Sequence, residues 1–306
     1  MKILFLADIH LRSASDCPRF RTDNHYESQF KELYEISDIA REQEIDIIIS
    51  LGDFFHHTQV SHQLVTDVLK WTQSLPCYTC SIVGNHDVTG YVTTDRNNGL
   101  GVLFEAGAIH QLTEIAFDRE KVAIKGIDAY LDPRQGDYMF DEKYNKYCKI
   151  VASHNFVIPQ QVLFDAVLPK DVKTNANLLV FGHYHKAFYH QEGNTVFANP
   201  GSISRWKIDE QHQPQVYIYD TNLDKIIAIK LKSSQPASEI FDLAAASELK
   251  TTEMNLQAFI DSLENTSFDT VDIEQVVTAE AIKQGITKNV LDAALAKVQQ
   301  AKLELK

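Results

Sequence analysis

Residues 2–10, KILFLADIH, contain the pattern on which the fold depends. The apolar run from Ile3 to Ala7 has the composition of a buried β-strand, and a carboxylate and an imidazole, Asp8 and His10, follow it directly. Ligands bind outside the carboxyl ends of sheet strands, because loops there leave side chains free to converge. The stretch therefore predicts a strand that delivers two polar groups to a site at the edge of a sheet.

Four further predicted strands end in residues of the same kinds. These residues are Asp53, then Asn85, His86 and Asp87, then His154, and finally His183 and His185. Each motif alone has an ordinary interpretation, such as a capped turn for Asp-x-His or a tight turn for Gly-Asp. Their recurrence at strand ends indicates one metal site instead. A set that mixes carboxylate oxygen with imidazole nitrogen suits manganese, iron or zinc, whereas magnesium and calcium prefer oxygen alone.

The order of the predicted elements indicates an α/β (α+β) fold. Short β-rich runs occupy residues 2–7, 46–51, 78–83, 121–126, 149–153, 178–181, 195–198, 215–220 and 225–231. Apolar residues recur at helical spacing between the first three runs, from 26 to 37 and from 64 to 69 after a Ser61 cap. The later strands follow one another after short turns. We therefore expect two stacked mixed β-sheets flanked by helices, with a single mixed sheet as the alternative.

A change of pattern at Ser233–Pro236 predicts a boundary between a main domain, residues 1–232, and a small C-terminal helical unit, residues 233–306. The tail carries two apolar stripes at helical spacing. The first comprises Leu256, Phe259, Ile260 and Leu263, and the second comprises Val290, Leu291, Ala294, Leu295, Val298 and Leu305. The tail holds 12 acidic residues and 6 lysines, so a protein surface is a better target for it than DNA. The alternative is a cap folded against the main domain.

Charge and composition exclude several classes of protein. The 29 basic and 42 acidic residues give a net charge of −13, so we expect no broad basic surface, and any contact with nucleic acid must be local. Two clusters could provide it, namely Arg12, Arg19 and Arg21, and Arg205, Trp206 and Lys207. For the three loop arginines, simple solvation is the alternative.

Cysteine content and hydropathy point to a cytoplasmic protein. Four cysteines in a chain of 306 residues form no disulfide framework, and Cys77 and Cys80 are expected in a strand and its lead-in. No apolar run reaches the roughly 20 residues of a membrane span. The apolar stretch before Asp8 is too brief for a secretory signal.

The motifs together resemble the signature of the calcineurin-like metallophosphoesterases. The resemblance rests on Asp8-x-His10, Gly52-Asp53, Gly84-Asn85-His86-Asp87, an isolated His154 and Gly182-His183-x-His185, and it spans residues 1 to about 231. It implies a catalytic main domain that hydrolyses phosphoesters with two divalent ions. Manganese is expected, with iron, zinc and magnesium as alternatives.

The resemblance also implies a role for each motif residue. One ion would be held by Asp8, His10, Asp53 and His185, and the other by Asp53, Asn85, His154 and His183. Asp53 would bridge the two ions, because its negative charge offsets their repulsion. His86 would face the substrate, as a stabiliser of the transition state or a proton donor, and Asp87 would orient His86.

Two segments are similar to the DNA double-strand-break repair nucleases of the SbcD type. These are Gly52-Asp53-Phe54-Phe55-His56, which makes His56 a second candidate catalytic histidine, and Asn199-Pro200-Gly201-Ser202. The similarity implies a manganese-dependent DNA exonuclease or endonuclease in repair or recombination. The chain departs from these nucleases in its acidity and in lacking a long segment usual in their capping region.

The same similarity implies a partner, an ATPase of the SbcC type, which would bind residues near 287–305 through Leu291, Leu295 and Val298. The oligomeric state stays open, and a homodimer is among the alternatives. Two other functions also remain: a phosphodiesterase or phosphatase for nucleotides or another small phosphoester, and a scaffold without catalytic activity.

Overall fold

The computed structural model describes residues 1–90, 92–129, 134, 137–162, 166–249, 277–278, 281 and 286–304. The chain divides into two compact units, Met1–Phe241 and Asp242–Lys306. The first unit thus includes the segment Ser233–Phe241, which the sequence pattern places in the tail. The first predicted apolar stripe of the tail, residues 256–263, and Leu305 lie outside the described residues.

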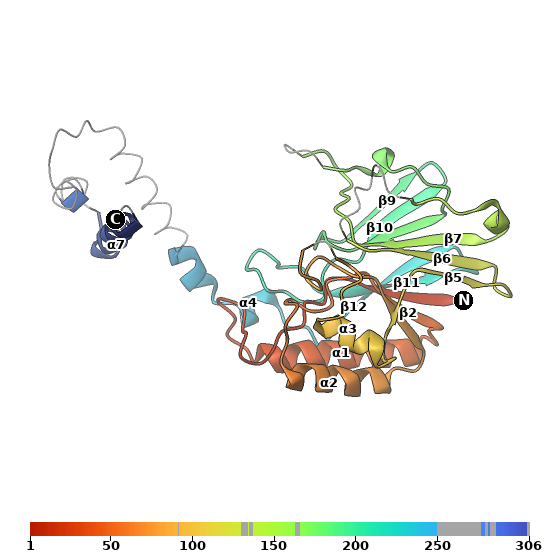
Figure 1. Ribbon diagram of the computed structural model, residues 1–306, viewed down its shortest axis with the longest axis horizontal. Coiled ribbons are helices and arrows are strands. Elements are labelled where there is room, and N and C mark those ends of the chain that lie inside the picture. The colour runs from red at the N-terminus through yellow and green to blue at the C-terminus, as the bar shows by residue number, and fades with distance from the viewer. Residues whose placement is uncertain are drawn as a thin grey trace. The chain divides into compact units, whose positions relative to one another are not determined.

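Two six-stranded mixed sheets form the core of the first unit (Figure 1). The first sheet has the order β12 (Lys225–Lys230), β11 (Gln215–Asp220), β1 (Lys2–Leu6), β2 (Ile47–Ser50), β3 (Tyr78–Ser81) and β4 (His110–Gln111). The second has the order β5 (Glu114–Phe117), β6 (Val122–Ile127), β7 (Cys148–Ser153), β8 (Leu178–Phe181), β10 (Thr195–Asn199) and β9 (Phe188–Glu192). Neighbours from β1 to β4 and from β6 to β10 run parallel, and the outer pairs run antiparallel. The prediction of two mixed sheets is confirmed.

Alternation along the strands explains why the sheets stack. Successive strand residues point to opposite faces, so in β1 Ile3 and Phe5 enter the core shared with the second sheet, while Leu4 and Leu6 face the helices. The shared core also takes Ile49 of β2 and Ile124 of β6. The sheets therefore pack through their inner faces, and this fixes the strand ends of one sheet beside those of the other.

Helices cover the outer face of the first sheet (Figure 1). They are α1 (His25–Glu42), α2 (His62–Ser74) and α3 (Gly99–Glu105). Each begins at a polar cap: the side chains of Asn24, Ser61 and Asn98 accept hydrogen bonds from backbone N–H groups of the first turn. The outer face of the second sheet is covered instead by residues 138–147, 155–158 and 166–172, which include two short 3₁₀ turns, η1 (Glu142–Tyr144) and η2 (Pro169–Asp171).

The C-terminal part contributes to both units. Helix α4 (Ala237–Ile240) and Phe241 pack with Phe20 and Ile208 of the first unit. In the second unit, helix α7 (Lys288–Glu304) buries Ala294 against Val277 and Ala281. The residues proposed for partner binding, Leu291, Leu295 and Val298, are half-buried around this cluster. In the described part of the chain, no helix combines the length and the apolar character that crossing a bilayer requires.

Candidate metal centre

The strand ends predicted to carry the site converge at one edge of the two stacked sheets. β1, β2 and β3 are parallel neighbours in the first sheet, and β7 and β8 are parallel neighbours in the second. Their carboxyl ends therefore open onto a common edge, where each loop contributes its polar residues. The structure brings together all of the predicted ligands there, from Asp8 to His185.

Glycines that precede the ligands allow this close approach. A β-carbon on Gly84 would lie 2.0 Å from the Asp53 backbone nitrogen, and one on Gly52 would lie 2.5 Å from Nδ1 of His154. Neither atom could move away without shifting a ligand, so the Gly-Asp and Gly-Asn pairs are a packing requirement.

Four of the ligands have left-handed backbone conformations. The φ angles are 49° at Asp8, 47° at His10, 48° at Asp53 and 71° at His183. Such conformations are uncommon outside glycine and persist where the surrounding structure holds them, often at functional sites. Here they turn each chain sharply after its strand and direct the side chain back across the sheet edge.

One group of ligand atoms comprises Asp8, His10 and His185. The two imidazoles face each other, with Nε2 of His10 3.1 Å from Nε2 of His185. Asp8 Oδ1 lies 3.9 Å from Nε2 of His185 and accepts a hydrogen bond from the His183 backbone N–H. Asp8 Oδ2 is buried and has no hydrogen-bond partner among the described residues.

A second group comprises Asp53, His154 and His183, with Asn85 beside them. Asn85 Oδ1 lies 3.0 Å from Nε2 of His154 and 2.8 Å from Nδ1 of His183. Asp53 Oδ2 lies 3.3 Å from Nε2 of His154 and 3.6 Å from Nε2 of His10. A single carboxylate oxygen thus faces both groups, as a bridging ligand would.

These residues fit a pair of divalent cations. In each group the carboxylate and imidazole ligand atoms lie within 4.8 Å of one another, the Asn85 amide oxygen lies beside the second group, and Asp8 adds a buried oxygen without a hydrogen-bond partner among the described residues. Burial raises the pKa of Asp8, because a buried carboxylate loses the water that stabilises its negative charge. A neighbouring cation would stabilise that charge. The mixed nitrogen and oxygen donors suit transition metals such as manganese, iron and zinc.

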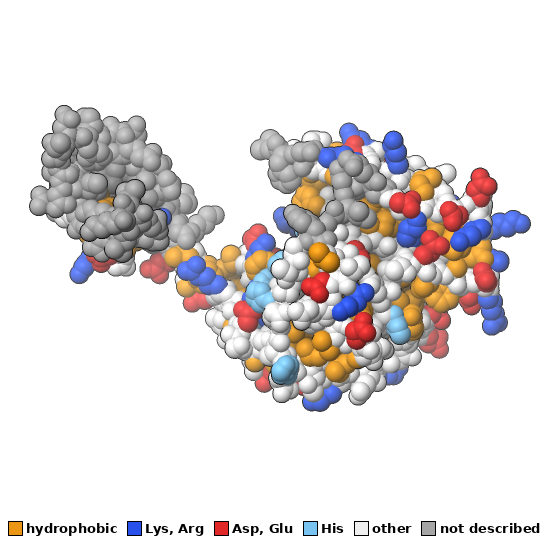
Figure 2. Space-filling model, viewed as in Figure 1, with side chains coloured by type: hydrophobic (Ala, Val, Ile, Leu, Met, Phe, Trp, Pro, Cys, Tyr) orange, Lys and Arg blue, Asp and Glu red, His pale blue; other side chains and the backbone are white. Residues whose placement is uncertain are grey.

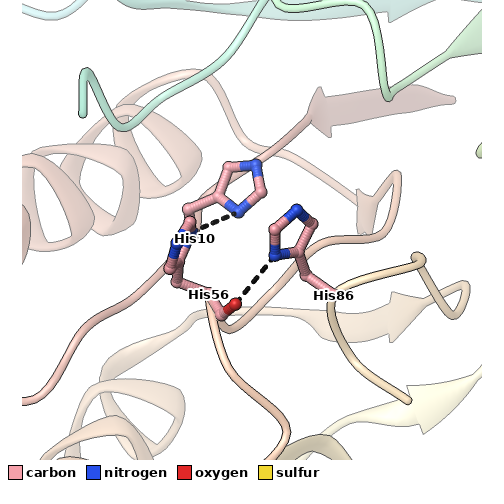
Figure 3. Close-up of side chains that lie close together, drawn as sticks. All are labelled: His10, His56 and His86. Carbon is pink, nitrogen blue, oxygen red and sulfur yellow. Dashed lines mark hydrogen bonds between the residues drawn. The ribbon is translucent and has the colours of Figure 1, made fainter. Parts of the chain in front are cut away.

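His56 and His86 lie beside the ligand His10 (Figure 3). His86 donates its Nδ1–H to the His56 backbone carbonyl over 2.8 Å, which leaves Nε2 as its free edge. His56 Nδ1 contacts Nδ1 of His10 at 3.3 Å, and His56 Nε2 accepts from the Arg12 guanidinium at 2.5 Å. His10, His56 and His86 could themselves hold an ion. The adjacent Arg12 cation opposes that arrangement.

Asp87 does not orient His86 in the way that the family resemblance implied. Its Oδ1 accepts hydrogen bonds from the backbone N–H groups of Phe54 and Phe55, and its Oδ2 accepts from Gly84. Asp87 therefore ties the third motif to the second. The His56 carbonyl, rather than Asp87, fixes the His86 ring.

The sequence comparison with known families matches this geometry. The family model of the calcineurin-like phosphoesterases matches residues 1–187. The chain belongs to the calcineurin-like phosphoesterase family. It is similar to the double-strand break repair protein MRE11 of Encephalitozoon cuniculi, with 22% identity over 286 residues. That match covers 77% of the chain and 48% of MRE11, so the chain spans about half the length of this relative.

Some solved structures are similar to this calcineurin-like phosphoesterase at low sequence identity. One is a dimetal phosphatase from Danio rerio, with 10% identity and a TM-score of 0.49, covering 76% of this chain and 99% of that chain. Another is an archaeal phosphodiesterase, with 14% identity and a TM-score of 0.40, covering 76% of this chain and 100% of that chain.

Burial and mutual charge set the ionisation of this phosphoesterase centre. Burial alone would raise the pKa of Asp53, but His154 and His10 lower it below its ordinary range. Burial alone would lower the pKa of His154, but Asp53 raises it to about 9. Burial and the charge of His154 lower the pKa of His183 to about 4. Asp53 is therefore ionised at neutral pH, and His154 must lose a proton when it binds a cation.

The three loop arginines proposed to contact DNA differ from one another: Arg19 is exposed, as simple solvation predicts, whereas Arg12 and Arg21 contact other residues of the chain. Arg21 is not simply solvated, because it pairs with the Asp23 carboxylate and donates to the Arg205 carbonyl. Arg205 is buried and donates to Ser234 and to the Gln235 carbonyl. Arg12 is buried beside His56 and pairs with Asp16. These side chains hold loops together around the metal centre.

Sequence reasoning did not find two groups that contact the histidine ligands from outside. The Leu51 carbonyl accepts from Nδ1 of His154 at 2.6 Å. The Glu210 carboxylate accepts from Nδ1 of His185. The carbonyl belongs to the backbone, and Glu210 lies 25 residues beyond its partner in a loop with no motif, so no local signal marks either.

Proposed function

We propose that the chain is a two-metal-ion phosphodiesterase that cuts DNA in repair or recombination, with manganese as its preferred metal. The observation that carries the phosphodiester chemistry is the position of Asp53 Oδ2, which faces His10 of one ligand group and His154 of the other. When bound, the ions would supply Lewis-acid chemistry, offsetting charge on the phosphoryl oxygens and making water nucleophilic.

The chain's own residues complete the chemistry. His86 keeps its Nε2 edge toward the reacting phosphate because Nδ1 is held by the His56 carbonyl. In its imidazolium form, which carries a proton on Nε2 as well as on Nδ1, His86 donates a hydrogen bond to a phosphoryl oxygen or a proton to the leaving oxygen. Arg12 and His56 continue the wall beyond His86, and their hydrogen bond holds a cation close to where negative charge develops.

A nucleotide substrate is supported by a hollow of about 400 Å³ beside the ligands His183 and His185. Phe156 and Tyr184 contribute aromatic rings to this hollow, and Lys186 and Lys207 contribute cations. Aromatic faces stack bases, and lysines contact phosphates, so the lining suits a nucleotide next to the scissile bond. The likeness to MRE11 favours DNA among nucleotide substrates.

The second candidate is a phosphodiesterase or phosphatase for a small phosphoester. The charge of the chain favours it, because acidic and basic side chains are interspersed over the face of the first unit drawn in Figure 2, and the net charge is −13. A long duplex gains affinity from many phosphate contacts, whereas a single nucleotide needs only the local hollow. Both candidates use the same metal centre.

A protein partner would resolve the difficulty of holding DNA with an acidic chain. We propose an ATPase of the SbcC type, with α7 and its half-buried Leu291, Leu295 and Val298 as the contact. The acidic character of residues 233–306 suits a protein surface better than a duplex. A second copy of this chain is the alternative partner.

One comparison of rates tests the proposal. The purified chain is assayed with manganese on linear double-stranded DNA, on a cyclic nucleotide and on bis-(p-nitrophenyl) phosphate, in the presence and absence of a candidate ATPase. Cleavage of DNA that the ATPase stimulates supports the nuclease. Hydrolysis of the cyclic nucleotide alone would establish the second candidate, and no hydrolysis of any diester would leave a non-catalytic scaffold.

A further inference from the structure

Glu210 is a buried carboxylate that contacts the metal-ligand candidate His185. It lies in the loop between β10 and β11, and its side chain is buried beside the metal centre. Its Oε1 accepts from Nδ1 of His185, and its Oε2 accepts from the backbone N–H groups of Trp206 at 2.7 Å and Lys207 at 2.9 Å. Three donors therefore converge on one buried carboxylate.

The contact with His185 decides which ring nitrogen is available to a metal. A carboxylate accepts, so Nδ1 of His185 carries the proton and Nε2 carries the lone pair. Nε2 is the atom that faces His10 at 3.1 Å and Asp8 at 3.9 Å. Glu210 thus holds His185 in the tautomer and the ring orientation that ligation requires.

The other histidine ligands are held differently. Nδ1 of His154 contacts a neutral backbone carbonyl, that of Leu51. His183 turns Nδ1 into the site, toward Asn85 and His154, and Nδ1 of His10 contacts Nδ1 of His56. Among the described metal-ligand candidates, the contact of His185 with Glu210 is therefore the one in which a carboxylate outside the site holds the ring. A negative charge on the far nitrogen makes the near nitrogen a stronger donor.

The contacts with Trp206 and Lys207 extend the effect of Glu210 beyond the metal. The indole of Trp206 lies 4.8 Å from the His56 ring and 6.4 Å from the His185 ring, between centroids. Lys207 lines the 400 Å³ hollow and places its ammonium 4.3 Å from the Trp206 ring. The carboxylate that orients His185 thus also holds the wall of the hollow.

We infer that Glu210 is a positioning residue that links occupancy of the Asp8, His10 and His185 group to the placement of Trp206 and Lys207 at the substrate hollow. The inference rests on the proposed two-metal function. Only a carboxylate can make both sets of contacts, the one with His185 and those with the Trp206 and Lys207 backbone. An amide has one acceptor oxygen, and its NH₂ group would face the N–H donors on the other side.

Metal titration of intact variants tests whether Glu210 supports metal binding by His185. Manganese binding to wild type, Glu210→Ala and Glu210→Gln is measured from the paramagnetic resonance of the free ion. We expect one of two dissociation constants to weaken 10- to 100-fold in Glu210→Ala, with a smaller change in Glu210→Gln, the usual range for removing the partner of a ligating histidine. Hydrolysis of a small diester should recover toward the wild-type rate at saturating manganese.

Acrylamide quenching of tryptophan fluorescence tests whether Glu210 holds Trp206 in place. The measurement reports mainly on Trp206, because Trp71 is fully buried and Trp206 is half-buried. Release of the Trp206 backbone should increase the quenching constant in Glu210→Ala. Glu192→Gln is the matched control, since Glu192 pairs with His190 at 3.2 Å on the exposed β9 strand, and it should change neither measurement.

The outcomes separate the inference from the function on which it rests. Wild-type protein that binds fewer than two manganese ions and hydrolyses no diester would remove the proposed function. Two intact manganese constants and unchanged quenching in a Glu210→Ala protein with a normal melting curve would overturn the role of Glu210 alone. If Glu210→Ala does not fold, the same readings on Glu210→Gln decide the matter.

Discussion

Gly84 lies so close to Asp53 that a β-carbon on it would stand 2.0 Å from the Asp53 backbone nitrogen and 2.2 Å from Oδ1. We therefore expect Gly84→Ala to displace the bridging carboxylate, with loss of bound metal and of hydrolysis. Metal content after gel filtration and the rate on a small diester measure this. Gly107→Ala is the control: its φ is +65° but no atom lies within 4 Å, so it should cost about 1 to 2 kcal/mol of stability and keep the activity.

Asp53→Asn should abolish hydrolysis even though the side chain keeps its shape. An amide removes the negative charge that offsets repulsion between the two ions, so metal content should fall as well. Elemental analysis and the diester rate at saturating manganese check both expectations. Wild-type turnover in this variant would show that Asp53 is not the bridge.

His86→Ala should separate metal binding from turnover. Its Nδ1 is held by the His56 carbonyl rather than by a ligand, so both ions should remain while the rate falls by about 10²- to 10⁴-fold, as expected when a proton donor is removed. His62→Ala, at an exposed residue of α2, is the control and should have the wild-type rate. Loss of an ion from His86→Ala would make His86 a ligand.

His25 should make the protein sensitive to acid. Burial, reinforced by the charge of Arg21, lowers the pKa of His25 to about 3. Between this pKa and that of the unfolded chain, His25 is protonated in the unfolded chain and neutral in the folded chain. Its contribution to stability is complete above the unfolded pKa of about 6.5 and is lost as the pH falls toward 3, at no more than about 1.4 kcal/mol per pH unit.

The substitution His25→Leu isolates the pH-dependent contribution of His25 to the free energy of unfolding. Neither ring nitrogen of His25 has a hydrogen-bond partner in the described residues, so leucine leaves no donor unpaired. In urea denaturation at pH 7, 6, 5 and 4.5, the free energy of unfolding of the variant should rise relative to that of wild type as the pH falls. Parallel stability curves for the two proteins would contradict the prediction.

Truncation should be tolerated after Phe241 but not after Gln235. The chain up to Phe241 is one compact unit, and Ile240 and Phe241 pack with Phe20 and Ile208. A chain ending at Phe241 should keep its melting temperature and hydrolyse a small diester, whereas one ending at Gln235 loses these contacts and should melt several degrees lower. Equal melting curves would show that α4 adds no stability.

The sequence predicted the parts of the site that follow strands. Asp8 and Asp53 stand directly after apolar β-runs, so the topology of parallel strands was enough to place them together. Strands without such a run, such as β9 with its sequence FYHQE, were missed because tertiary pairing rather than local hydrophobicity forms them. The two main sheets were predicted nevertheless, since the central strands alternate between two buried faces.

The residues that hold the ligands and the surrounding loops in place could not be predicted from the sequence. Glu210 reaches His185 only because the loop after β10 returns to the sheet edge, and Asp87 contacts backbone groups whose positions no pattern reveals. For Arg12 and Arg21 the expectation of simple solvation was wrong for the same reason, since Arg12 pairs with Asp16, and Arg21 pairs with Asp23 and donates to the Arg205 carbonyl in the folded chain. Contacts between loops depend on tertiary geometry rather than on composition.

The positive φ angles at Asp8, His10, Asp53 and His183 narrow the routes by which this centre could evolve. Apart from glycine, the left-handed region best tolerates Asn, Asp and His, which are also common metal ligands. Cysteine or glutamate, though able to bind metals, would incur backbone strain at the same positions. A change of metal preference would therefore have to arise largely from residues around the ligands, because the backbone and the cation restrict each of these four positions to nearly the same small set of amino acids.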